Sequence, residues 1–258
     1  MPFVICIANQ KGGIGKTTTA TTLASILCRL GKKTLLIDAD PQCNSTDTYR
    51  ASVHQTATLF DVVLDNDPIS LNDAVQHTPI GDIVASDPLL KEADTRFPSD
   101  GEEYFRLKDA IDSLKGYDYV VIDTAPSDNK LLKNCIVSAD KIVIPLTADR
   151  YSISGLAELH KTIAIQKKRN NPALEIAGLL LVKFNPRQKL AQEVKNALDV
   201  IAVQQMDTKV FSTFIRQSIA VQQAQAARMN LIDFAPKSPA ACDYQAFVHE
   251  LLELKGEV

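Results

Sequence analysis

The residues with the clearest chemistry lie near the start of the chain, in a loop rich in glycine and lysine. Residues 9–19 read NQKGGIGKTTT. Glycines allow a backbone to turn tightly and to direct its N–H groups at the oxygens of a phosphate. A helix that begins at such a loop adds the positive end of its dipole. The pattern predicts a phosphate-binding loop in which Lys16 reaches the β- and γ-phosphates and Thr17 ligates Mg²⁺.

One position departs from the general pattern G-x-x-x-x-G-K-[ST], because Gln10 stands where that pattern has glycine. The surroundings of the loop still favour phosphate binding. An apolar run, Phe3–Ala8, precedes it, and apolar residues recur at helical spacing between positions 23 and 30. Gly31 then stands where the C-terminal cap of a helix is expected. A strand, a glycine-rich loop and a helix in this order are the context that a P-loop requires.

Carboxylates follow two other apolar runs. Thr34–Ile37 leads into the letters DADPQ, which include Asp38 and Asp40, and Tyr119–Ile122 leads into Asp123. In open α/β sheets, ligands bind at the carboxyl ends of the strands, so we expect these three aspartates beside the phosphate loop. Mg²⁺ keeps several waters and binds through one or two carboxylates. The sequence therefore predicts a magnesium site at Asp123.

The elements that must position these residues are strands alternating with helices. The expected strands are continuous rather than alternating apolar runs, which is typical of strands covered on both faces: Phe3–Ala8, Thr34–Ile37, Tyr119–Ile122, Ile142–Leu146 and Ile176–Val182. Helical periodicity also marks residues 151–169, 187–203 and 239–254. We expect an α/β fold with a single doubly wound, mostly parallel sheet flanked by helices. Residues 1–258 are expected to form one domain, with Ser86–Gly101 as an irregular loop or lid.

Composition limits the possible functions. The 258 residues include 45% hydrophobic and 23% charged residues, which argues against disorder. The net charge of −3 excludes a uniformly basic coat for nucleic acid but allows a local basic cluster, because salt screens remote charges. The five cysteines are odd in number and form no CxxC pair, so we expect neither a disulfide framework nor a zinc site. No export signal or membrane span is recognised, and we expect a cytoplasmic protein.

The loop KGGIGKTT, with Lys11 ahead of its glycines, resembles the deviant Walker A motif of the ParA/MinD family of P-loop ATPases. The opening NQKGG is most similar to the ParA branch. The letters DADPQ and the stretch DTAP that begins at Asp123 resemble two further motifs of that family. The resemblance extends through most of the chain and implies the family's P-loop NTPase fold, with ATP and Mg²⁺ as its ligands. It implies that Lys11 crosses a dimer to the partner's nucleotide and that Asp40 orients or deprotonates the attacking water.

The same resemblance supplies the full set of expected site residues. The catalytic residues are Lys11, Lys16 and Asp40. The residues around the phosphates are Lys11, Gly12, Gly13, Ile14, Gly15, Lys16, Thr17 and Thr18. The candidates near the base are Asn185, Arg187 and Pro236, and the metal site comprises Thr17, Asp38 and Asp123. The stretch TFIRQS resembles a late segment of the family that contacts DNA, which makes Arg216 and the nearby Arg228 the DNA-binding candidates.

The resemblance implies an ATPase that segregates plasmid or chromosomal DNA. The expected partners are a second copy in the ATP state, nonspecific double-stranded DNA, and a centromere-binding, ParB-like adaptor that stimulates slow basal hydrolysis. The expected location is the cytoplasm, in association with the nucleoid. The P-loop begins within ten residues of the start, as in the short class of these ATPases, which lacks an operator-binding extension.

Three alternatives share this loop. A ParA-like ATPase that positions a protein cargo has the same motifs. A MinD-like membrane switch needs a basic amphipathic tail, whereas this chain ends HELLELKGEV, with three glutamates and one lysine. An iron–sulfur relative needs a cysteine directly after the aspartate that corresponds to Asp123, and this chain has Thr124, Ala125 and Pro126 there. The last two alternatives are therefore disfavoured.

Overall fold

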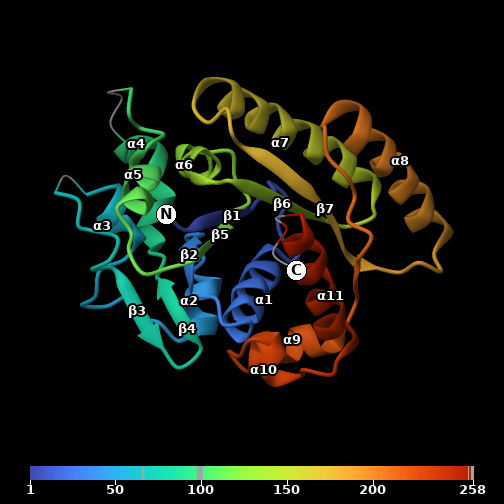
Figure 1. Cartoon of the computed structure of the whole chain (residues 1–258), viewed down its shortest axis with the longest axis horizontal. Coiled ribbons are helices and arrows are strands. Elements are labelled where there is room, and N and C mark those ends of the chain that lie inside the picture. The colour runs from blue at the N-terminus through green and yellow to red at the C-terminus, as the bar shows by residue number, and fades with distance from the viewer. Residues whose placement is uncertain (66, 98–100, 255, 257–258) are drawn as a thin grey trace.

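The molecule is built around one central sheet with helices packed against it (Figure 1). The computed structural model describes residues 1–65, 67–97, 101–254 and 256. Within these ranges, eight strands pair in the order β3-β4-β2-β5-β1-β6-β7-β8. Their bounds are β1 Phe3–Ile7, β2 Thr34–Ala39, β3 Val75–Thr78, β4 Gly81–Val84, β5 Tyr119–Thr124, β6 Lys141–Leu146, β7 Glu175–Phe184 and β8 Ile215–Arg216. The five apolar runs identified in the sequence are β1, β2, β5, β6 and β7, which confirms the predicted fold class.

The sheet is parallel except at one edge. Strand β1 lies between β5 and β6, with both pairs parallel, and β2 pairs in parallel with β5 and β4. Only β3 runs antiparallel, as a hairpin with β4. Both strands of this hairpin are short and partly exposed, so they lack the continuous apolar run that marked the other strands in the sequence. Adjacent parallel strands end at the same edge, and their C-terminal residues are therefore brought together.

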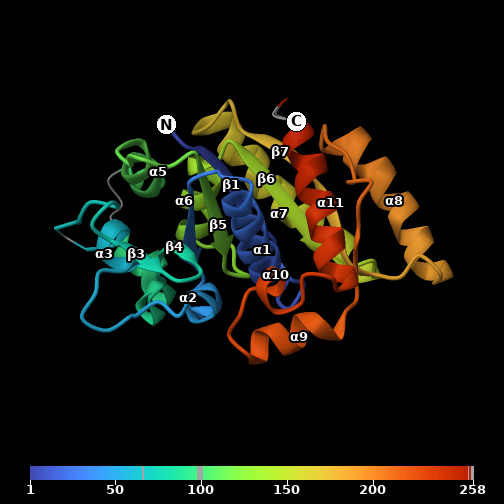
Figure 2. The same cartoon turned by 60° about the horizontal axis from the view of Figure 1, so that its bottom comes forward.

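Helices cover both faces of the sheet (Figures 1 and 2). Their bounds are α1 Lys16–Arg29, α2 Asn44–Tyr49, α3 Leu59–Val63, α4 Ala93–Arg96, α5 Arg106–Asp112, α6 Lys130–Ser138, α7 Arg150–Arg169, α8 Lys189–Gln205, α9 Ile219–Ala226, α10 Leu231–Phe234 and α11 Pro239–Glu253. Side chains alternate along β1: Ile5 and Ile7 pack with α1, α10 and α11, whereas Val4 and Cys6 face α5, α6 and α7. This burial on both faces explains why the central strands are continuous apolar runs with polar residues only at or near their ends.

The helix that follows the phosphate loop begins and ends at glycines. Gly15, with φ of 85°, directly precedes Lys16, the first residue of α1, and Gly31, with φ of 79°, follows the helix end. Such left-handed conformations favour glycine because it has no Cβ. The helices expected at residues 151–169, 187–203 and 239–254 are α7, α8 and α11, with ends within two residues of the prediction.

The late part of the chain is attached to α1 by polar contacts in the core. The hydroxyls of Thr19 and Tyr244 share a hydrogen bond of 3.0 Å. The Nδ2 of Asn230 donates to the carbonyl of Thr21 at 2.7 Å. Figure 2 shows α11 lying alongside α1, and Asp233 of α10 pairs with Arg29, the last residue of α1. The helix that carries Lys16 and Thr17 is thus held from its outer side by residues more than two hundred positions later.

The expectation of an irregular loop at Ser86–Gly101 was only partly correct. A 3₁₀ helix spans Pro88–Glu92 and is followed by α4, while positions 98–100 lie outside the described residues. The Asp87 carboxylate caps the 3₁₀ helix by accepting the N–H of Leu89 at 2.7 Å, and Leu90 is fully buried. Burial of this leucine stabilises a helical turn that sequence periodicity is too short to reveal. Of the helices in the described residues, none has the length and apolar character needed to cross a membrane.

Candidate active site

The phosphate loop joins the end of β1 to the start of α1. Gly13, with φ of 71°, and Gly15 take left-handed conformations, and these turns bring Lys16 to the first position of α1. The buried Asn9 side chain fixes the entry: its Oδ1 accepts the N–H of Lys11 at 2.9 Å, and its Nδ2 donates to the carbonyl of Pro145 at 2.8 Å. Asn9 was not among the expected site residues, although its place directly after a strand is where such a contact forms.

Lys16 is buried in the floor of the loop. The residue is only 6% exposed, and its Nζ donates a hydrogen bond to the carbonyl of Lys11 at 3.1 Å. Burial lowers the pKa of Lys16, while the nearby carboxylates of Asp123 and Asp40 act in the opposite direction. A desolvated ammonium is well suited to contact phosphate oxygens, because water screens its charge less.

Asp123 ends β5 with an unsatisfied carboxylate oxygen. Its Oδ2 accepts the hydroxyl of Ser45 at 2.8 Å, whereas its Oδ1 is buried and has no hydrogen-bond partner among the described residues. Burial raises the pKa of Asp123, and the hydroxyls of Ser45 and Thr17 lower it in part. A buried carboxylate oxygen left free beside a threonine hydroxyl fits a Mg²⁺ ion or one of its waters. These residues therefore fit the expected metal.

Asp38 lies opposite Asp123 in the pairing of β2 with β5. Its Oδ2 accepts both the N–H and the hydroxyl of Thr46, at 2.8 and 2.7 Å, and its Oδ1 accepts the N–H of Asp40 at 3.1 Å. Burial raises its pKa, and the adjacent Asp123 raises it further. Both oxygens of Asp38 are thus engaged with the segment that carries Asp40 and begins α2. Asp38 therefore fixes the backbone of this segment next to Asp123.

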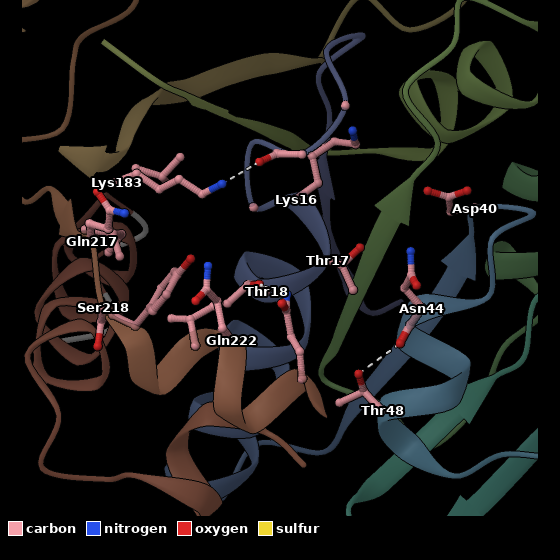
Figure 3. A pocket seen from close by; sticks show the side chains of 18 of the residues that line it. Lys16, Thr17, Thr18, Asp40, Asn44, Thr48, Lys183, Gln217, Ser218 and Gln222 are labelled. Atoms are coloured by element: carbon pink, nitrogen blue, oxygen red, sulfur yellow. Dashed lines mark hydrogen bonds between the residues drawn. The ribbon is translucent and has the colours of Figure 1, made fainter. Parts of the chain in front are cut away.

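Asp40 lines the same cavity as Lys16 and Thr17 (Figure 3). Its Oδ1 accepts the N–H of Gln42 at 2.9 Å, and its own carbonyl accepts the Ser86 hydroxyl at 2.7 Å. These contacts hold the backbone and one carboxylate oxygen, and they leave Oδ2 available. A carboxylate fixed beside the phosphate loop can orient a water molecule and accept its proton.

The cavity has a volume of about 930 Å³. In Figure 3, Lys16, Thr17 and Thr18 lie between two walls: Asp40, Asn44 and Thr48 form one, and Lys183, Gln217, Ser218 and Gln222 form the other. Two contacts connect α9 and the residues just after it to the cavity lining. The Nε2 of Gln225 donates to the hydroxyl of Thr18 at 3.1 Å, and Arg228 pairs with Asp47 of α2 at 3.2 Å. None of the α9 glutamines was assigned a nucleotide role from the sequence.

Of the three residues expected near the nucleotide base, the structure places two side by side and the third elsewhere. Asn185 and Arg187 line a neighbouring hollow of about 630 Å³, which shares Arg216 and Gln217 with the main cavity. Pro236 is exposed and lies outside the lining of both hollows. The end of β8 therefore separates the phosphate loop from Asn185 and Arg187.

Lys11 is held within its own subunit. Its Nζ forms an ion pair of 2.7 Å with Oδ2 of Asp149, the residue that caps the N-terminus of α7. Asp149 also accepts the hydroxyl of Thr147 at 2.5 Å. Partial burial alone raises the pKa of Asp149, but the bonds from Lys11 and Thr147 outweigh it and the net change is downward. An aspartate before a helical stretch is a recognisable cap, yet its contact with Lys11 has no signal in the sequence.

Both arginines expected to bind DNA are paired with carboxylates. Arg216 forms a two-pronged pair with Asp243 of α11, with Nη2 2.7 Å from Oδ1 and Nε 2.9 Å from Oδ2. Its Nη2 also donates to the carbonyl of Pro239 at 3.3 Å. Arg228 pairs with Asp47, as described above. In this arrangement the charges of both arginines are offset by neighbouring acids.

Comparisons with known proteins agree with this geometry. A family model described as an AAA domain matches residues 3–176. The chain is 32% identical over 253 residues to the chromosome partitioning protein ParA of Caulobacter vibrioides, covering 96% of this chain and 93% of the relative. It is 34% identical over 255 residues to the chromosome-partitioning ATPase Soj of Thermus thermophilus, covering 96% and 94%.

Solved structures share the fold over nearly the whole chain. The ATP complex of a McdA variant from Cyanothece superposes with a TM-score of 0.86 and 25% identity, covering 98% of this chain and 96% of the other. Cobyrinic acid a,c-diamide synthase from Mycobacterium smegmatis, with bound ADP and magnesium, superposes with a TM-score of 0.83 and 27% identity, covering 100% and 96%.

Proposed function

The chain belongs to the ParA-type family of P-loop ATPases, and from this membership we propose that it hydrolyses ATP to move DNA during segregation. In this proposal residues 1–258 act as one ATPase domain. The protein dimerises with ATP, binds nonspecific double-stranded DNA as that dimer, and is stimulated by a centromere-binding adaptor.

The observation that carries the proposal is the meeting of three chain segments at the carboxyl edge of the sheet. Lys16 and Thr17 of the phosphate loop and Asp40 after β2 line the cavity, and Asp123 near the end of β5 is buried next to Thr17 and Lys16. Phosphoryl transfer depends mainly on positioning and on charge stabilisation. This arrangement supplies N–H donors, an ammonium, a hydroxyl and carboxylates in the places that such a reaction needs.

Each side chain has a distinct role in the proposal. The loop from Lys11 to Thr18 surrounds the phosphates, with Lys16 on the β- and γ-phosphates. Asp40 orients the attacking water and accepts its proton. Thr17 and Asp123, with Asp38 behind them, hold Mg²⁺, which offsets negative charge on the phosphate oxygens when it is bound. The hydroxyl of Thr18 is already engaged by Gln225 of α9, so nucleotide binding and the position of α9 are connected.

Slow basal turnover follows from the position of Lys11. In one subunit its ammonium is paired with Asp149, and the proposal requires it to act on the nucleotide of a second copy. Two facing triphosphates concentrate negative charge at the interface, and a lysine from each side offsets it. Hydrolysis therefore waits for dimerisation and, in the proposal, for the adaptor that completes the site.

The alternatives differ in what the ATPase moves. Positioning of a protein cargo uses the same cavity and differs only in the adaptor. A MinD-like membrane switch is disfavoured because the apolar face of α11 is already used: Phe247, Val248 and Leu251 pack against the sheet and α1. We therefore propose a cytoplasmic, nucleoid-associated protein.

The proposal is tested by a gel shift with nonspecific DNA without nucleotide, with ADP and with ATP, each with Mg²⁺. We expect retention only with ATP. We also expect Lys16→Ala to abolish retention, because this variant loses nucleotide binding. Hydrolysis of ATP, measured on the same samples, is expected to be slow and to require Mg²⁺. Equal retention with ADP and ATP would remove the nucleotide switch, and hydrolysis unaffected by Lys16→Ala would contradict the assigned site.

A further inference from the structure

Lys183, near the end of β7, has a backbone conformation that a lysine rarely adopts. Its φ is +53°, in the left-handed region where a side chain crowds the backbone. The pairing of β7 with β8 shifts register at the same place: Val182 faces Ile215, and Phe184 faces the next residue, Arg216. Lys183 is therefore the extra residue of a β-bulge. Bulges concentrate beside active sites, where they redirect a side chain.

The bulge directs Lys183 to the phosphate loop. Its Nζ donates to the carbonyl of Gly13 at 2.7 Å. In Figure 3 its side chain extends along the wall of the cavity toward the loop. The same strand end makes a second contact, because the Cγ2 of Val182 lies 3.9 Å from where a Cβ of Gly15 would be. The end of β7 thus contacts the two left-handed glycines of the loop.

The hydrogen bond from Lys183 to the Gly13 carbonyl also affects the N–H group on the other side of the same peptide, which is available for phosphate. In a trans peptide the carbonyl oxygen and the amide hydrogen point in opposite directions. The carbonyl of Gly13 and the N–H of Ile14 belong to one peptide unit. An ammonium on the carbonyl side polarises this unit and strengthens the N–H as a donor on the other side. Lys183 therefore acts on phosphate binding through the backbone of the loop.

The stem of Lys183 has a second role. The residue lines the cavity between the phosphate loop and the end of β8. A lysine stem is apolar along its four carbons, while its ammonium stays at a polar partner. The stem therefore forms a wall of the part of the cavity that leads away from the phosphates, where the rest of a nucleotide must lie.

We propose that Lys183 is a nucleotide-positioning residue: its ammonium fixes the Gly13 peptide of the phosphate loop, and its stem forms a wall beside the bound nucleotide. This inference rests on the proposed ATPase function. It assigns Lys183 to binding rather than to the chemical step, because its ammonium contacts a carbonyl of the loop. Backbone strain that persists beside a functional cavity is consistent with such a role.

The test compares Lys183→Met, which keeps the stem and loses the charge, with Lys183→Arg, which keeps a cation. Calorimetric titration with ADP and Mg²⁺ is expected to show about tenfold weaker binding for Lys183→Met, equal to about 1.4 kcal/mol. Lys183→Arg is expected to restore affinity to within about threefold, since it offers the same charge to the carbonyl. The ATPase assay is expected to show a raised KM with an unchanged kcat for Lys183→Met. The matched control is Lys189→Met, on a lysine whose side chain is 92% exposed, and it is expected to match the wild type.

A third variant separates this role from a structural one. Asparagine tolerates the left-handed conformation better than lysine does, so Lys183→Asn is expected to have a melting temperature at least equal to that of the wild type while binding ADP more weakly. Wild-type affinity in Lys183→Met, or a lowered kcat with an unchanged KM, would overturn the inference. A wild-type protein that binds no nucleotide would instead refute the proposed function itself.

Discussion

At the scale of single residues, the ion pair with Asp149 restrains Lys11, the side chain to which the proposal assigns the contact with a second copy. The two side chains are 35% and 38% exposed, and their charged atoms lie 2.7 Å apart. Partly exposed pairs of this kind contribute little to stability, about 0–1 kcal/mol. The pair can therefore open without unfolding its surroundings. The pair instead limits what Lys11 can contact, because an ammonium bound to Asp149 is not free to reach a second subunit.

This view predicts opposite effects for two substitutions. Lys11→Ala is expected to bind ATP with affinity close to that of the wild type and to lose ATP-dependent dimerisation. Asp149→Asn removes the charge that competes for Lys11, so dimers are expected at an ATP concentration several-fold lower. Light scattering after size-exclusion chromatography in ATP and Mg²⁺ measures both effects. Lys11→Ala protein that dimerises like the wild type would contradict the assigned role of this lysine.

At the scale of elements, β7 connects the core to the phosphate loop. Gly178 lies near its middle, where a Cβ would be 2.6 Å from Cε2 of Phe211. The ring of Phe211 in turn meets Phe247 of α11 edge to face, at a centroid distance of 5.0 Å. The absence of a side chain at Gly178 thus allows α11 to approach the sheet. The strand that carries Lys183 is thus fixed by packing at its centre.

We therefore expect Gly178→Ala to lower the free energy of unfolding by about 1–3 kcal/mol, as overpacking does in other cores. For a chain of this size, each kcal/mol shifts the melting temperature by about 2–4 °C. The matched control is Gly155→Ala in α7, where an added Cβ meets no atom within 4 Å. That change is expected to stabilise the helix by about 0.5–1 kcal/mol. Thermal denaturation followed by circular dichroism measures both, and equal melting temperatures would contradict the packing argument.

At the scale of the whole molecule, the proposed attraction to DNA would have to overcome a net charge of −3. The two arginines assigned to DNA lie at opposite ends of α9, and each is paired with an acid, Arg216 with Asp243 and Arg228 with Asp47. Asp47 also lines the nucleotide cavity. On α9, Ala224 is buried and Ala220 and Val221 are partly buried against the core, so few apolar contacts hold this helix in place. Release of the two arginines would supply cations for the DNA binding that we propose to depend on nucleotide.

The corresponding prediction concerns the protein without nucleotide. Asp243→Asn removes the charge that holds Arg216, so retention of nonspecific DNA without ATP is expected to rise several-fold at low salt. Each phosphate contact adds about 0.9 to the slope of log affinity against log salt, which provides a second readout. Asp199→Asn is the control, because Asp199 pairs with Lys195 on α8, in a different part of the molecule. If Asp243→Asn and Asp199→Asn behave alike in the gel shift, the arginines are not restrained by this pairing.

The sequence was sufficient for those parts of the fold and site that depend on local pattern. The long parallel strands contain continuous apolar runs, and the glycine-rich loop has a fixed spacing from the first strand to Lys16, so both were correctly located. The hairpin of β3 and β4 and the two-residue strand β8 were not, because short, half-exposed strands carry no periodic signal. Contacts between distant positions, such as Lys11 with Asp149 and Lys183 with Gly13, had no local signal at all. They arise only when the sheet brings the ends of its strands together.

The hydrogen bond between Thr19 and Tyr244 also bears on how the protein is made. The two residues are 225 positions apart, and a ribosome adds about 5–20 residues per second. The helix that presents Lys16 therefore emerges some 10–45 seconds before the helix that covers its outer side. During that interval the nascent chain exposes the apolar surface of α1, where Leu23 and Leu27 are fully buried in the finished protein. Nucleotide capture is thus one of the last properties acquired in translation, and protection by chaperones matters most before it.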